Sequence, residues 1–112
     1  MQYLVHMKLA AAARPTTPEA GRVLAEQFIL PTLAQCEELV AQKKILAGGP
    51  VGGTIAIVLI VEADAVPELD RLLTSLAAWP QMETEVTPLT TFDGRRQSLL
   101  SRFRESEAQS RQ

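Results

Sequence analysis

The chain has 112 residues and a formal net charge of −2 at pH 7, and 46% of its residues are hydrophobic. This length and apolar fraction fit one globular domain. The mild acidity argues against binding of the nucleic-acid backbone, and an aromatic content of 4% argues against base stacking on single strands.

The single cysteine and the single histidine limit covalent and metal chemistry. Cys36 alone cannot form an intrachain disulfide, and one Cys36 with one His6 does not make a zinc site. The longest apolar run, residues 55–61, is far too short to cross a bilayer, and no secretion signal opens the sequence. We therefore expect a cytoplasmic protein with no metal or cofactor, no nucleic-acid partner and no membrane contact.

The first third of the chain predicts a strand, a loop and a long helix. Residues 1–9 alternate between two faces, as a strand does. After a loop over residues 10–16, Thr17 is suited to be an N-cap for a helix that begins at Pro18 and runs to about residue 44. Pro31 lacks an amide hydrogen and should kink or split this helix. The two faces of the strand carry Tyr3, Val5, Met7 and Leu9 on one side, and Leu4, His6 and Lys8 on the other.

The middle of the chain predicts two more strands and a second helix. Residues 45–47 predict a short strand, and the glycine-rich residues 48–53 predict a turn. Residues 54–62 are apolar on both faces, which is typical of a central strand. A helix opens at Asp64 and stops at Trp79, because the residue before a proline disfavours the helical region.

The last third predicts a fourth strand and a tail. Residues 81–89 alternate, with Glu83 and Glu85 on one face and Thr84 on the other. The sequence Asp93-Gly94 predicts a turn. The remaining residues, with Leu99, Leu100 and Phe103 at helical spacing, predict an amphipathic helix or a partly disordered tail.

This element order predicts an α+β fold. Strand, helix, strand, strand, helix, strand is the ferredoxin-like βαββαβ arrangement, here over residues 1–92, with a C-terminal helical or partly disordered tail over residues 93–112. Right-handed crossovers place strands one and three at the centre of an antiparallel sheet, with strand four beside strand one. Both helices then cover one face of this sheet.

The other face of the sheet is left open and partly apolar. Such a face usually marks an interface, so we expect a homodimer or higher homo-oligomer that closes sheet against sheet around a cavity, as in a dimeric α+β barrel. The arginine-rich tail is either a solvated helix with internal ion pairs or a segment that reaches over the cavity of a neighbouring subunit. The residues that we expect to line the pocket are Leu4, Ala56 and Val58, with Trp79 either at the cavity mouth or packed on the core.

The alternation of the strands groups four ionisable side chains on this open face. His6 and Lys8 of the first strand should share it with Glu83 and Glu85 of the fourth. Such groups in one half-buried pocket change one another's proton affinities, which suits proton abstraction and return. Cross-strand ion pairing on a solvated or dimer-facing surface is the alternative, and it stays open.

Two segments resemble the muconolactone delta-isomerase family. From Leu73 to Leu89, as in that family, a leucine-rich helix is followed by a turn with proline and an aromatic residue, then Met82-Glu83 and Glu85-Val86. Residues 3–8 are similar to the family's first strand, which also has a basic residue near position six. The resemblance implies a ferredoxin-like fold, sheet-to-sheet dimers in larger assemblies and a C-terminal segment packed across subunits.

The resemblance also implies a reaction, a cofactor-free proton shift in an unsaturated lactone during the breakdown of aromatic compounds. We expect Glu85, with Glu83 as second choice, to take a proton alpha to a carbonyl, while His6 or Lys8 stabilises the enolate charge. Two alternatives remain. The first is a cofactor-free oxygenase or cyclase of the same barrel architecture, and the second is a non-catalytic module that binds small molecules.

Overall fold

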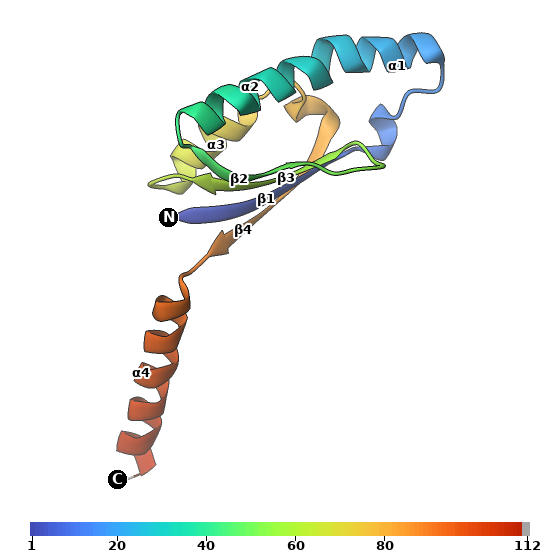
Figure 1. Ribbon diagram of the computed structural model, residues 1–112. Helices are drawn as coiled ribbons and strands as arrows, with labels where there is room; N and C mark the ends of the chain where they lie inside the picture. Colours follow the sequence, from blue (N-terminus) through green and yellow to red (C-terminus); the bar gives the residue numbers. More distant parts are fainter. Residues whose placement is uncertain (111–112) are drawn as a thin grey trace.

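The computed structural model describes residues 1–110 and has an α+β fold (Figure 1). In chain order the elements are β1 (Gln2–Leu9), a 3₁₀ turn η1 (Ala11–Ala13), α1 (Pro18–Leu24), a π-helical segment η2 (Ala25–Ile29), α2 (Leu30–Ala41), β2 (Ile45–Pro50), β3 (Ala56–Glu62), α3 (Val66–Thr74), a 3₁₀ turn η3 (Trp79–Gln81), β4 (Met82–Leu89) and α4 (Phe92–Ser110).

The four strands form one antiparallel sheet in the order β2-β3-β1-β4. Helices α1, α2 and α3 lie on the same side of this sheet (Figure 1). The predicted ferredoxin-like order, with strands one and three at the centre and strand four beside strand one, is confirmed. The fold is therefore ferredoxin-like, with a helix added at the C-terminus.

The core lies between the sheet and its helices. Alternate residues of β1 and β3 point toward this layer because successive side chains of a strand face opposite sides. They meet the apolar stripe of α3, and all of them are buried. The core members from these three elements are Tyr3, Val5, Met7, Ile57, Leu59, Val61, Leu69, Leu72 and Leu73.

The long first helix is split, as its proline predicts. Thr17 caps it, since its Oγ1 accepts a hydrogen bond from the Ala20 amide at 3.1 Å. The segment η2 separates α1 from α2 just before Pro31, which is the second residue of α2. A wider π turn relieves the contact between the proline ring and the preceding turn of the helix.

The predicted turn over residues 48–53 is wrong in its first half. Gly48 to Pro50 belong to β2, and β3 begins at Ala56. Gly48 has a φ of +113°, and a side chain there would place its Cβ 2.0 Å from the Val58 carbonyl oxygen. Because Gly48 has no side chain, β2 can approach β3 closely at this position. A glycine-rich sequence is compatible with such a close approach and with a turn, and composition alone does not distinguish the two.

Two helix boundaries also differ from the prediction. The helix α3 ends at Thr74, before Trp79, and Trp79 instead begins η3. The residues Asp93-Gly94 lie in the first turn of α4 and do not form a separate turn. The Thr91 hydroxyl accepts a hydrogen bond from the Gly94 amide at 2.8 Å, so a local cap converts this turn signal into a helix start.

The helix α4 projects away from the sheet and its helices (Figure 1). The radius of gyration is 19.2 Å, whereas a compact chain of this length has about 13 Å. The tail is helical from Phe92 to Ser110, and residues 111–112 lie outside the described part of the chain. No helix within residues 1–110 is long and apolar enough to span a membrane.

Candidate functional site

The four ionisable residues that the strand alternation grouped do lie together on the open face. His6 is directly opposite Glu85 of β4 on one side and Val58 of β3 on the other. Lys8 is opposite Glu83 on β4 in the same way. Directly opposed residues of antiparallel strands point to the same face, with Cβ atoms about 5 Å apart.

One pair on this face is an ion pair. The Lys8 Nζ lies 3.6 Å from the Glu83 Oε2, and more than half of each side chain is exposed. Exposed pairs of this kind contribute about 0–1 kcal/mol to stability. In the single chain, Lys8 and Glu83 therefore form the cross-strand ion pair that was the alternative to a role in proton transfer.

The other pair on this face, His6 and Glu85, forms no ion pair. His6 is half-buried between β3 and β4, and Glu85 is exposed. Within residues 1–110 no hydrogen bond joins the imidazole of His6 to the carboxylate of Glu85. A half-buried imidazole beside an available carboxylate is an arrangement that can accept a proton from a ligand and return it.

Three of the four residues that were expected to line a pocket lie together on the open face. Leu4, Ala56 and Val58 surround His6 on the open face and are all partly exposed. Trp79 lies elsewhere, because it packs against the core cluster on the helix-covered side of the sheet. The structure therefore brings the first three together and does not bring Trp79 to them.

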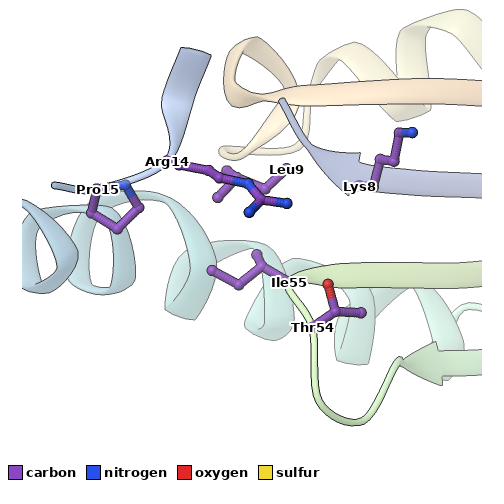
Figure 2. Close-up of a pocket in the computed structure, with 6 residues that line it drawn as sticks. All are labelled: Lys8, Leu9, Arg14, Pro15, Thr54 and Ile55. Atoms are coloured by element: carbon purple, nitrogen blue, oxygen red, sulfur yellow. The ribbon is translucent and has the colours of Figure 1, made fainter. Parts of the chain in front are cut away.

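A pocket of about 310 Å³ lies at one end of the sheet (Figure 2). Arg14 lines it and was not among the residues that the sequence singled out. The available signal was its place between a run of four alanines, residues 10–13, and Pro15, a rigid setting for a long cation. The pocket is lined by Lys8, Leu9, Arg14, Pro15, Thr54 and Ile55.

Comparison with known proteins now gives the family. The family model described as muconolactone delta-isomerase matches residues 1–94. The chain belongs to the muconolactone delta-isomerase family. A search of curated protein sequences finds no match to it.

Solved structures share the fold of this muconolactone delta-isomerase family member. A crystal structure of muconolactone isomerase matches with a TM-score of 0.64 at 20% identity, over 81% of this chain and 90% of that one. The 5-chloro-2-hydroxyhydroquinone dehydrochlorinase TftG from Burkholderia phenoliruptrix AC1100, in complex with 2,5-dihydroxybenzoquinone, matches with a TM-score of 0.61 at 21% identity, over 84% and 98%. At these identities the likeness concerns the fold.

The cysteine of this family member lies away from the open face. Cys36 is buried on α2, and desolvation by burial raises the pKa of its thiol. A thiol in such surroundings stays protonated and is a poor nucleophile. Among residues 1–110 no group of three or more His, Cys, Asp and Glu is arranged to hold a metal ion.

Proposed function

We propose that the protein is a cofactor-free isomerase that shifts a proton within a small unsaturated lactone or organic acid of aromatic-compound catabolism. Membership of the muconolactone delta-isomerase family supports the reaction class. The observation that carries the assignment of residues is the register of β1 and β4, which sets His6 opposite Glu85 on the open face.

In this mechanism the Glu85 carboxylate takes a proton from the carbon alpha to the substrate carbonyl. The electron pair left behind delocalises as an enolate, and His6 or Lys8 stabilises the negative charge on its oxygen. The proton then returns to a different carbon, so that the double bond moves and the product is an isomer of the substrate. Glu83 is the second choice as base, because Lys8 already occupies its carboxylate.

We also propose that a second copy of the chain covers the open face. Apolar side chains there, among them Leu4 and Ile60, remain partly exposed in the single chain. Contact with a second sheet would exclude water from His6 and Glu85 and strengthen their electrostatic interactions with the substrate. A lone cysteine, which forms no intrachain disulfide, is consistent with the cytoplasmic location that we propose.

The helix α4 supports the same assembly. It presents an exposed apolar stripe, with Phe92 at 99%, Leu99 at 41% and Phe103 at 62% exposure. Most of the stability of a helix in a protein comes from packing of its apolar face, and the apolar face of α4 is not packed in the single chain. We therefore place α4 against a neighbouring subunit. Multi-angle light scattering should show a dimer or larger, and Leu99→Asp together with Phe103→Asp should reduce its size.

Turnover by purified protein tests the proposed reaction. A panel of unsaturated lactones, muconolactone among them, is followed by ultraviolet absorbance. We expect isomerisation of at least one of them, and a loss of about 100-fold or more in Glu85→Gln. Glu37→Gln, an exposed glutamate of α2 on the far side of the sheet, is the matched control and should keep full activity.

Other outcomes identify the alternatives. Turnover that stops when dioxygen is removed would instead indicate an oxygenase. Thermal stabilisation by lactones with no turnover would indicate a binding module, since a ligand stabilises the state that binds it. Full activity in a folded Glu85→Gln protein would reject the role of Glu85.

A further inference from the structure

The pocket at the end of the sheet adjoins the open face. It lies where β1 ends and β3 begins, and Lys8 belongs both to its lining and to the open face. His6 precedes Lys8 by two residues on the same face, a separation of about 7 Å. A small molecule held in this pocket can therefore reach the pair of His6 and Glu85.

The backbone around Arg14 is fixed by local hydrogen bonds. The Ala10 amide bonds to the Gln81 carbonyl oxygen at 2.9 Å, which ties the loop to the start of β4. The Arg14 amide bonds to the Ala11 carbonyl oxygen at 3.3 Å. Pro15 restricts Arg14 to the extended region, where it is found at φ −62° and ψ 127°. The base of the arginine side chain is thus held in one position.

The guanidinium of Arg14 has no protein anion to pair with. It reaches toward Leu9 and Ile55 at the ends of the two strands (Figure 2). Among the described residues, no carboxylate lies within 4.0 Å of it, whereas Lys8 is paired with Glu83. The pocket therefore has an unpaired cation on a fixed backbone, and none of its lining residues is acidic.

The remaining lining suits a small organic anion. Leu9 and Ile55 provide apolar contact, and the hydroxyl of Thr54 points into the same space (Figure 2). A guanidinium pairs with a carboxylate through two parallel hydrogen bonds, which an ammonium cannot reproduce. A hydroxyl nearby can donate a third.

We propose that Arg14 binds the carboxylate of an anionic substrate and positions its unsaturated part over His6 and Glu85. This inference rests on the proposed function and adds the residue that recognises the carboxylate of the substrate. Arg14 is a specificity-determining residue that selects the anion over its neutral ester.

Binding measured without turnover tests this role. Isothermal titration calorimetry compares muconolactone with its methyl ester in a Glu85→Gln background, so that neither probe is consumed. We expect Arg14→Gln to weaken binding of the carboxylate by about tenfold or more and to leave the ester unchanged. Arg14→Lys should lose less, because it keeps the charge without the paired geometry. Arg71→Gln, an exposed arginine of α3, is the matched control and should change nothing.

The outcomes separate this inference from the proposed reaction. Selective loss of carboxylate binding in Arg14→Gln supports the site even if no lactone is turned over. Equal affinity in Arg14→Gln and its parent, equal loss for acid and ester, or no binding of muconolactone would each overturn it. Inorganic phosphate is added as a competitor, and displacement of muconolactone by equimolar phosphate would overturn the assignment to a carboxylate. In an active enzyme, Arg14→Gln should raise KM for the acid and change kcat little.

Discussion

The two faces of the sheet come from the same strands and have opposite surroundings. On the helix-covered face, six alternate residues of β1 and β3 are 0–6% exposed and wholly apolar except for the Tyr3 hydroxyl; they are Tyr3, Val5, Met7, Ile57, Leu59 and Val61. On the open face, their immediate neighbours Leu4, His6 and Val58 are partly exposed, and charged residues stand among them.

This difference separates stability from function within one sheet. The covered face excludes water and needs no other molecule to do so. The open face keeps ionisable groups available and leaves apolar surface without a partner in the single chain. A change on the covered face should therefore alter folding, and a change on the open face should alter ligand binding, turnover or assembly.

The largest expected difference is between two adjacent residues of β3. Leu59→Ala removes a side chain that is 2% exposed and should lower the free energy of unfolding by about 3 kcal/mol. Val58→Ala on the open face should cost less than about 1 kcal/mol in dilute protein. Urea denaturation of both variants measures this, and equal losses would remove the distinction between the faces.

The close approach of β2 to β3 gives the next effect. Gly48→Ala should lower the free energy of unfolding by about 2 kcal/mol, because its φ is positive and its Cβ would meet the Val58 carbonyl oxygen. Gly49→Ala is the matched control, since a Cβ at that position has no atom within 4 Å. Thermal unfolding should show a lower Tm for the first variant only. Similar Tm values for both would contradict the register of β2 and β3.

The cap of the helix layer gives a smaller effect. Thr17→Ala removes the acceptor for the Ala20 amide and should cost about 1 kcal/mol in chemical denaturation. Thr16→Ala, one residue earlier in the exposed loop, is its control and should be close to neutral. Turnover should be the same in both, and a loss of turnover in Thr17→Ala alone would link the helix layer to the site.

The smallest expected effect is a pH dependence of the free energy of unfolding, caused by the buried Cys36 thiol in the helix layer. Burial raises the pKa of the Cys36 thiol, so the unfolded chain loses this proton at a lower pH than the folded chain. The free energy of unfolding should therefore be unaffected by this group below the unfolded pKa and should fall as pH rises from about 8 to 10. Cys36→Ala should show a weaker decline over this range in urea denaturation, and an identical decline would contradict it.

The sequence predicted the strands and their faces well because the signal is local. Alternation in residues 1–9 and 81–89 depends on the two-residue period of a strand, and the cap at Thr17 depends on its own neighbours. The same alternation placed His6 and Glu85 on one face. That they are directly opposite needed the register of β1 and β4, which no single strand encodes.

The errors came where composition suits two structures. Gly48 is a turn residue by type, yet it lies in β2 because the approach of β3 excludes a side chain. Asp93-Gly94 is a turn signal that Thr91 converts into a helix start. The pocket of Arg14 joins three separate segments, so the local setting of Arg14 beside Pro15 did not by itself indicate a pocket.

Deuterium incorporation during turnover tests the central claim most directly. Isomerisation of the lactone that the protein turns over is followed by proton NMR in deuterated water, which reports both the new double bond and the carbon that gained solvent hydrogen. A base at Glu85 predicts that Glu85→Gln slows both signals together by about 100-fold or more, with an unchanged free energy of unfolding. A folded Glu85→Gln protein that isomerises and exchanges at the wild-type rate would contradict proton transfer on the open face.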